Sequence, residues 1–451
     1  MRTYFNAFAV VLFCLILINI RIGFGPYLED IELAKEPKDT SPDALMLREC
    51  KLSLRQKLIS VDFVGYSKVL RLLKTYWETY NVLEKNLTSS KETDQMRRNV
   101  ISCYEKLEEF TLPWIKSSKF NNLLDLANYF NNGQRGVVIS SYNKYFDYTV
   151  HLIKGLKWLS FNIPIVIAFA GDDDLSVERQ KYFNSMNIST IDLTRYFNNE
   201  IIELTGFAIK PFAVLAAPFE EVMLLDCDTV FLKSPAKMFD DEEYLKTGLL
   251  LQKDRSFHHE LYKQRLWLLE NLPKPLSKSI TESLVFQGNS DHQVDSSLLV
   301  INKRKQLFSL LTACKLNMPV ERRNFYEHFY GDKESFWFGP EMMFMNTSFL
   351  PYDPGVFGRF KDGVKHKLCG RQLMFDREGE PFYFNEAIVW HKQVEEPERR
   401  GIMEIPTHYD YAARWFEEGE NRCLYAKGIP FEREILDKFE ILIDFYKHVK
   451  L

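Results

Sequence analysis

The sequence of 451 residues predicts an α/β fold with a doubly wound, mostly parallel sheet, preceded by a helical stem and one N-terminal transmembrane helix. Two observations support this fold class. From about Gly136 onward, short apolar runs alternate with segments of helical periodicity, as in parallel sheets covered by helices. Before that point, a charge-free segment is followed by helical stripes alone. With 46% hydrophobic and 27% charged residues, the composition is that of a folded globular protein.

The N-terminal segment from Thr3 to Ile20 contains no charged residue. Its length is near the lower limit of about 17 apolar residues for a helix that crosses a bilayer. Arg2 precedes it, Arg21 follows it, and no small-residue cleavage motif comes soon after. We interpret residues 4–20 as an uncleaved signal-anchor that leaves residues 1–3 cytoplasmic, and a cleaved signal peptide is the alternative.

The sequons and the cysteines favour the secretory lumen for the rest of the chain. We predict N-glycosylation at Asn86, Asn187 and Asn346. Of the seven cysteines, Cys14 lies in the predicted anchor, and the other six allow up to three disulfides. Cys227, in an apolar run, is interpreted as a free buried thiol. The net charge of −4 gives no case for nucleic-acid binding.

Residues 21–130 form the predicted stem, which begins with a polar linker. Residues 66–87 and 96–110 each place their apolar side chains on one helical stripe, so two helices are expected. Pro113 ends the second helix. The main domain is expected to occupy residues 131–451.

Strands and helices are expected to alternate along the main domain. The expected strands are residues 137–140, 165–169, 190–193, 221–232 and 296–301. The expected helices are residues 148–159, 210–217 and 435–446. Since ligands of parallel sheets bind beyond the carboxyl ends of the strands, the functional site is expected at that edge.

The run from Val222 to Leu232 carries two carboxylates, Asp226 and Asp228, in an otherwise apolar sequence. Residues two apart in a strand point to the same face, so these side chains are expected to lie side by side. Two like charges this close need a cation, and a hard divalent ion with oxygen ligands meets that need. The pattern predicts a metal site, and an ion pair with a residue such as Lys233 is the alternative. If the ion also bridges a diphosphate, the site is that of a sugar-nucleotide-dependent transferase.

Four further polar residues are candidates for sugar chemistry. Asp295 and Ser296 lie at the start of an expected strand and are predicted to bind sugar hydroxyls, with an ordinary turn as the alternative. Asp332 and Glu334 lie beside aromatic residues and are predicted to orient or deprotonate an acceptor hydroxyl. A capped helix start is the alternative for this second pair.

Two other sequences could contribute metal ligands. His391 is predicted to complete the metal site as a neutral imidazole, and a structural histidine is the alternative. The acidic residues 172–174 also follow an apolar strand, but acids in that place favour the start of a helix.

An ordered set of motifs in the main domain resembles a known family. In chain order the motifs are Lys210–Leu215, Phe219–Asp228, Thr247-Gly248, Lys253–Arg255, Asp295–Lys303 and Gly331–Trp337. Together they resemble the fungal Golgi α-1,3-mannosyltransferases that extend mannan side chains. The resemblance runs from about Val137 to about Lys392 and leaves out the stem.

The resemblance implies a GT-A type fold, GDP-mannose as the donor, Mn²⁺ as the cofactor and a single-pass type II Golgi membrane protein. It implies that Asp226 and Asp228 hold the manganese and the donor diphosphate and that Lys210 lies near the nucleotide. Ser140 and Tyr142 are predicted as further donor contacts. Asp332 and Glu334 are implied to face the reacting sugar or the acceptor.

The sequence therefore predicts an α-1,3-mannosyltransferase that moves mannose, with retention, to mannose-terminated N- or O-linked glycans of secretory and cell-wall proteins. No nucleophile is identified, and attack on the face that the diphosphate leaves is at least as compatible with retention. An α-1,2-mannosyltransferase, a UDP-hexose-dependent transferase and a catalytically silent, sugar-binding Golgi scaffold are the alternatives.

Overall fold

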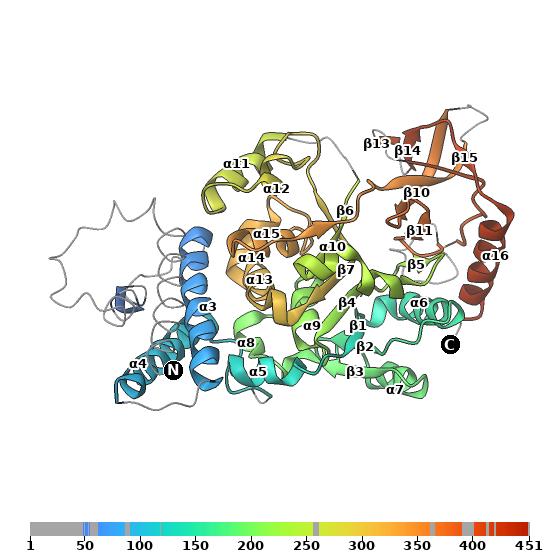
Figure 1. Cartoon of the computed structure of the whole chain (residues 1–451). Helices are drawn as coiled ribbons and strands as arrows, with labels where there is room; N and C mark the ends of the chain where they lie inside the picture. The colour runs from blue at the N-terminus through green and yellow to red at the C-terminus, as the bar shows by residue number, and fades with distance from the viewer. Residues whose placement is uncertain are drawn as a thin grey trace, which may run out of the picture. The chain divides into compact units, whose positions relative to one another are not determined.

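The computed structural model describes residues 48, 50–52, 54, 62–85, 91–117, 119–255, 261–360, 366–389, 401–411, 415–418 and 421–449. The chain forms two compact units, the first ending at Pro113 and the second beginning at Trp114 (Figure 1). The predicted signal-anchor at residues 4–20 lies outside the described residues. Within the described ranges, no helix is both long and apolar enough to cross a membrane.

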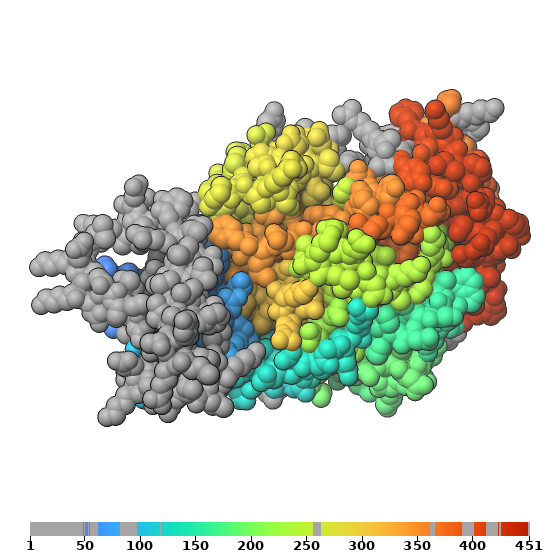
Figure 2. Space-filling model, viewed as in Figure 1, coloured from blue at the N-terminus to red at the C-terminus, as the bar shows by residue number. Residues whose placement is uncertain are grey.

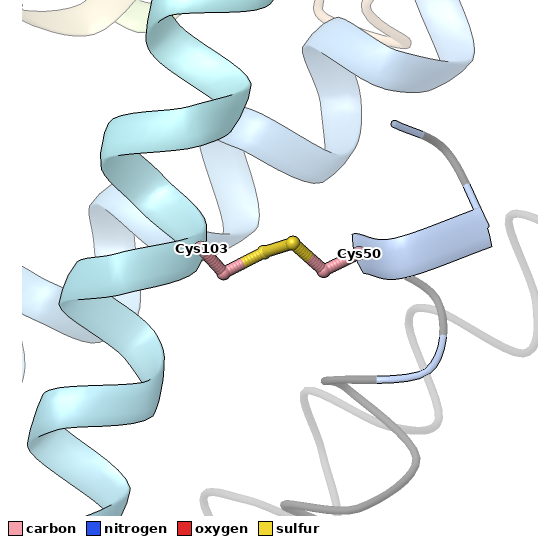
Figure 3. The surroundings of a disulfide bond; sticks show 2 residues. All are labelled: Cys50 and Cys103. Atoms are coloured by element: carbon pink, nitrogen blue, oxygen red, sulfur yellow. A yellow bond between two sulfur atoms is a disulfide. The ribbon is translucent and has the colours of Figure 1, made fainter. Parts of the chain in front are cut away.

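The first unit contains two packed helices, α3 (Phe63–Lys85) and α4 (Lys91–Thr111). They confirm the two helices predicted from apolar stripes. Their contact buries apolar side chains such as Leu73 and Leu107 completely. A disulfide joins Cys50 to Cys103 of α4 and closes a loop of the chain within this unit (Figure 3).

The second unit is built on a seven-stranded sheet. Its strands, in spatial order, are β3 (Ser189–Asp192), β2 (Ile165–Phe169), β1 (Arg135–Ser140), β4 (Glu221–Asp226), β7 (Val294–Asn302), β6 (Leu249–Lys253) and β8 (Ser348–Phe349). β7 runs antiparallel to both neighbours, and the other strands share one direction. The predicted mixed α/β fold with a mostly parallel sheet is confirmed.

The central strands are buried on both faces, as their continuous apolar runs predict. Ile139 and Leu225 point to the face that α6 (Phe146–Trp158) covers, and they share a buried cluster with Ile153 of that helix. Val138 and Leu224 point to the opposite face and are also completely buried. The helix α9 (Ile209–Ala216) also packs against two central strands of the sheet, β1 and β4.

The predicted strand at residues 221–232 is wrong as one element. β4 ends at Asp226, where the backbone turns so that the amide and the hydroxyl of Thr229 donate to the Asp226 carbonyl, at 3.2 and 2.8 Å. The chain then continues as β5 (Val230–Phe231) in a different sheet. The turn escapes sequence patterns because Cys227 and Thr229 within it are buried like strand residues.

The remaining helices cover this sheet or connect its strands (Figure 1). They are α5 (Leu123–Phe130), α7 (Val177–Ser185), α8 (Asn199–Ile202), α10 (Glu242–Thr247), α11 (Leu261–Asn271), α12 (Lys278–Thr281), α13 (Lys303–Leu316), α14 (Pro319–Tyr326) and α15 (Ser335–Met342). α13 and α15 pack so closely at Gly339 that a Cβ there would clash with the carbonyl oxygen of Ser309. Glycine at this position therefore permits the close approach of the two helices.

A second, eight-stranded sheet follows in the sequence and was not predicted. Its main path is β13 (Trp415–Glu418), β14 (Asn421–Tyr425), β10 (Lys367–Phe375), β9 (Gly355–Phe360), β12 (His408–Asp410) and β15 (Ile429–Pro430), with β11 (Pro381–Phe384) paired to β10 and β5. The disulfide Cys369–Cys423 joins β10 to β14. The predicted C-terminal helix is confirmed as α16 (Arg433–Lys447), whose Phe439 packs in one buried cluster with Phe357 of β9.

The two sheets are joined through segments that are distant in the sequence. Figure 2 shows the orange segment around residue 375 lying against the yellow-green segment around residues 230–245. There Lys233 forms an ion pair with Asp376 at 2.9 Å, and Arg377 binds the carboxylate of Asp241. The second sheet thus lies close to the end of β4, where the predicted site begins.

Candidate active site

The ammonium group of Lys210 lies at the centre of a cluster at the carboxyl end of β4. Its Nζ is 2.5 Å from the Asp226 carboxylate and 3.7 Å from the Asp332 carboxylate, and it donates to Ser296 Oγ at 3.2 Å. Asp228 follows in the turn and is buried. The structure therefore brings together five residues that the sequence placed in the site, from four separate segments.

The charges in this cluster are unbalanced. Burial raises the pKa of Asp226 to about 6 even though Lys210 opposes the shift, and the Asp228 carboxylate adds to it. Burial alone would lower the pKa of Lys210, but Asp226 and Asp332 raise it overall, so Lys210 stays protonated. One ammonium pairs with two carboxylates, and Asp228 adds a third beside Asp226, so the site is suited to a further cation.

Asp332 and Glu334 lie in the loop before α15, and both are buried. Glu334 Oε1 accepts hydrogen bonds from the amides of Gln293 and Val294, at 2.8 and 3.2 Å. Glu334 precedes the helix but makes no capping hydrogen bond, so the capped-helix alternative is wrong for its side chain. Burial raises the pKa of Glu334 to about 7 and raises the pKa of Asp332 as well.

Some buried polar atoms of the site are not satisfied by the protein. Within the described residues, Glu334 Oε2, Asp332 Oδ2 and Ser140 Oγ accept or donate no hydrogen bond. Buried polar groups are normally paired, so these atoms are available to a polar ligand or to water.

Asp295, at the start of β7, belongs to a second buried network. Its Oδ1 accepts from the amide of Ser297 at 2.8 Å, which is the local bond of the turn alternative. Its Oδ2 also accepts from Gln372 Nε2 at 3.3 Å, and the same amide lies 3.4 Å from Asp254 Oδ1. Asp254 in turn binds Lys333 at 2.6 Å.

Opposite pKa shifts distinguish the two carboxylates of this network. Burial and the neighbouring Asp254 raise the pKa of Asp295 to about 6. Burial acts in the same direction on Asp254, but Lys333 and Arg255 outweigh it and lower the pKa of Asp254 to about 2. Asp254 therefore stays ionised in mildly acidic solution, whereas Asp295 changes its protonation state near pH 6.

The sequence did not single out Asp254, Lys333 or Gln372 as site residues. Asp254 follows β6 directly, and β6 runs in the same direction as β4, so the rule of carboxyl strand ends could have found it. Lys333 lies between the two predicted acids. Gln372 is in the middle of β10, where no local pattern marks it.

Ser140 and Tyr142 lie on the other side of β4, at the end of β1. Ser140 is the register partner of Asp226 across the parallel strand pair. The Tyr142 ring packs 4.6 Å from that of Tyr145, and burial, Tyr145, Cys227 and Asp228 together raise the pKa of Tyr142. Cys227 is a buried thiol that takes part in neither of the two disulfides, as predicted.

The structure describes two of the alternative or additional residues considered for the metal site, Lys233 and the acidic triplet, but not His391. Lys233 pairs with Asp376, so the cation beside Asp226 is Lys210 instead. In the acidic triplet, Asp174 accepts from the amide of Ala170 at 2.9 Å, which is a turn contact. His391 lies outside the described residues.

Asp226 and Asp228 provide a partial set of metal ligands. In the part of the chain that the structure describes, no cluster of three or more His, Cys, Asp or Glu side chains could hold a metal ion. Two carboxylates at a strand edge nevertheless fit a hard divalent cation that takes its other ligands from water and phosphate oxygens.

Comparison with known proteins shows the sequence family of the chain. Residues 134–375, more than half of the chain, match the sequence family described as "Mannosyltransferase putative", and the chain belongs to this family. The α-1,3-mannosyltransferase MNT2 of Saccharomyces cerevisiae is 26% identical over 297 residues, covering 57% of this chain and 52% of the relative. The α-1,3-mannosyltransferase MNT3 of the same yeast is 27% identical over 303 residues, covering 57% and 47%.

The chain spans about half the length of these curated relatives. Among solved structures, the bifunctional glycosyltransferase WbbM in its apo form aligns with a TM-score of 0.33 and 12% identity, covering 62% of this chain and 51% of that chain.

Proposed function

We propose that this protein is an α-1,3-mannosyltransferase with a GT-A type fold that moves mannose from GDP-mannose to mannose-terminated N- or O-linked glycans. The observation that carries the proposal is the cluster in which Lys210 joins Asp226, Asp332 and Ser296 at the carboxyl edge of the sheet. The family match covers these residues, and the names of the yeast relatives support the transferred sugar and the linkage.

The donor is proposed to bind across the ends of β1 and β4. Ser140 and Tyr142 contact the nucleotide on the β1 side, where the Ser140 hydroxyl has no protein partner among the described residues. Asp226 and Asp228, with His391 as a proposed third ligand, would be the residues that hold Mn²⁺. The bound ion would neutralise the charge of the leaving diphosphate as a Lewis acid. Lys210, which pairs with Asp226, is proposed to contact the phosphate oxygens of the donor.

The acceptor is proposed to bind on the β7 side, near Asp295, Ser296, Asp332 and Glu334. Glu334, with a pKa of about 7 and an unpaired Oε2, can hold a hydrogen bond to a sugar hydroxyl in either protonation state. In the proposed retaining reaction the bond from the anomeric carbon to phosphate breaks and a bond to the acceptor oxygen forms on the same face. The acceptor proton passes to the departing phosphate oxygen.

The protein is further proposed to be a type II Golgi membrane protein with its catalytic unit in the lumen. The charge-free segment from Thr3 to Ile20 supports the anchor. The disulfides Cys50–Cys103 and Cys369–Cys423 support an oxidising compartment. Asn187 and Asn346 are exposed, as N-glycosylation requires, and Asn86 lies outside the described residues.

The proposal is tested by incubating the purified full-length chain with Mn²⁺, GDP-mannose or UDP-hexoses, and short α-mannose acceptors, followed by linkage analysis. Transfer from GDP-mannose into an α-1,3 linkage is the expected result. An α-1,2 product, a UDP-sugar preference, or sugar binding without transfer would each replace the proposal with one of its alternatives.

A further inference from the structure

Two aromatic rings lie exposed to solvent beside the candidate active site. Phe207 is 45% exposed and Tyr330 is 64% exposed, and their ring centroids are 5.3 Å apart. Phe207 belongs to the short helix η4 (Gly206–Ala208), and Tyr330 belongs to the loop before α15. We call this pair the aromatic platform. Contiguous exposed apolar surface of this kind often marks a binding site.

Each of the two chain segments that form the aromatic platform also contributes a residue to the candidate active site. Phe207 is three residues before Lys210, and Tyr330 is two residues before Asp332. The Lys210 ammonium lies 3.7 Å from the Asp332 carboxylate, so the two segments that carry the rings also meet at the candidate active site. Lys333, which binds Asp254 at 2.6 Å, lies 5.3 Å from the centre of the Tyr330 ring.

Gly331 determines how closely the two rings approach. Its φ of +69° is in the region that favours glycine. A Cβ at this position would lie 2.9 Å from ring atoms of Phe207, so a larger residue would displace that ring. The platform therefore depends on a specific backbone arrangement in the loop that also carries Asp332.

The chemistry of the platform fits a pyranose ring. One face of a hexose presents C–H groups, which an aromatic face attracts through its negative quadrupole, and the ring's edge presents hydroxyls. The platform offers the apolar surface, and the neighbouring carboxylates, Ser296 and Lys333 offer hydrogen-bond partners for the hydroxyls. Ligand sites typically combine aromatic walls with a few such polar groups.

The position of the platform favours an acceptor sugar, and not the base of the donor nucleotide, as the ligand that it binds. Tyr142 and Ser140, proposed to contact the nucleotide, lie at the end of β1. The platform is linked instead to Asp332, and His292, just before β7, lies 6.4 Å from the Tyr330 ring. Ser140 is at the end of β1 and His292 just before β7, and these two strands flank β4 on opposite sides.

We propose that Phe207 and Tyr330 form an acceptor subsite that stacks on a mannose ring of the glycan that receives the transferred sugar. This inference rests on the proposed function and names its acceptor-binding surface. The platform would hold the acceptor with one edge toward Asp332 and Glu334.

The kinetic test compares Phe207→Ala, Tyr330→Ala and Tyr330→Phe with the wild-type full-length chain. Loss of either ring is expected to raise KM for α-mannobiose about tenfold, with KM for GDP-mannose changed less than twofold. Tyr330→Phe keeps the stacking face and is expected to retain the wild-type KM. Tyr425→Ala, which removes a 67% exposed tyrosine from β14, is the matched control.

A direct binding measurement separates this inference from the proposed function. Titration of α-mannobiose into each protein by calorimetry reports the subsite even if the wild type transfers no mannose from GDP-mannose. Binding by the wild type that weakens about tenfold in both alanine variants supports the subsite. Unchanged binding in those variants, absence of binding by the wild type, or an increase in KM for GDP-mannose instead would overturn it.

Discussion

Lys210 Nζ lies 2.5 Å from Asp226 Oδ1, and this contact joins the second residue of α9 to the last residue of β4. The same ammonium reaches Asp332, 106 residues beyond Asp226 in the sequence of 451. A single cation thus holds together the donor and acceptor sides of the proposed site. Several consequences of this arrangement can be measured.

Replacement of Lys210 by methionine leaves the carboxylates of Asp226 and Asp332 without the ammonium group that pairs with both. Removal of one member of a buried ion pair typically costs about 3–5 kcal/mol of the free energy of unfolding. Denaturant unfolding of Lys210→Met without metal should show a loss of this size, and Mn²⁺ should recover more stability in the variant than in the wild type. Lys246→Met removes an exposed lysine that pairs with Glu243 and should leave the unfolding midpoint unchanged. Wild-type stability of Lys210→Met would contradict the central role of this residue.

The raised pKa of Glu334 predicts how the free energy of unfolding depends on pH. Burial raises the pKa of Glu334 in the folded protein to about 7 from an ordinary value of 4.5. A carboxyl group whose folded pKa is raised stabilises the fold fully below its unfolded pKa, and this stabilisation is lost as pH rises through the folded pKa. Between pH 5 and 8, the wild type should therefore lose on the order of 3 kcal/mol relative to Glu334→Gln, which carries no charge. Thermal unfolding of both proteins across this range measures the difference, and parallel pH profiles would show that Glu334 is not the titrating group.

Gln372 tests whether the second sheet contributes to the site. Its amide lies 3.3 Å from Asp295 and 3.4 Å from Asp254, so Gln372→Leu leaves two buried carboxylates without this donor. We expect a loss of about 1–3 kcal/mol in the free energy of unfolding and at least a roughly tenfold loss in kcat/KM. Gln372→Glu adds a third carboxylate and should be more severe. If both variants keep wild-type kcat/KM, the network is structural and does not serve transfer.

The elements of the main sheet were predictable because buried strands appear as continuous apolar runs. Residues 165–169 match β2 completely, and α9 and α16 lie within one or two residues of their expected bounds. The end of β4 at Asp226 does not follow from this pattern, because the apolar run continues to Leu232. The partner of Asp226 could not be predicted, because Lys233 is closer in sequence whereas Lys210 is brought close by the packing of α9 on β4.

The second sheet could not be predicted from sequence patterns, because several of its strands are very short. Its strands β5 and β15 have two residues each, and β12 has three, which is too short for an alternation of apolar and polar residues to show. Gln372, which this sheet contributes to the site, is a buried polar residue in the middle of a strand. Its role depends on tertiary contacts with Asp254 and Asp295, which the local sequence does not contain.

Calorimetric titration of GDP into the full-length chain, with and without Mn²⁺, tests most directly whether Asp226 and Asp228 form a metal–diphosphate site. The wild type should bind GDP in a Mn²⁺-dependent manner, and Asp226→Asn and Asp228→Asn should each abolish that dependence. Asp172→Asn, which removes an exposed acid of the rival triplet, should bind as the wild type does. GDP binding that is equally strong with and without Mn²⁺, or that persists unchanged in both Asn variants, would contradict the account.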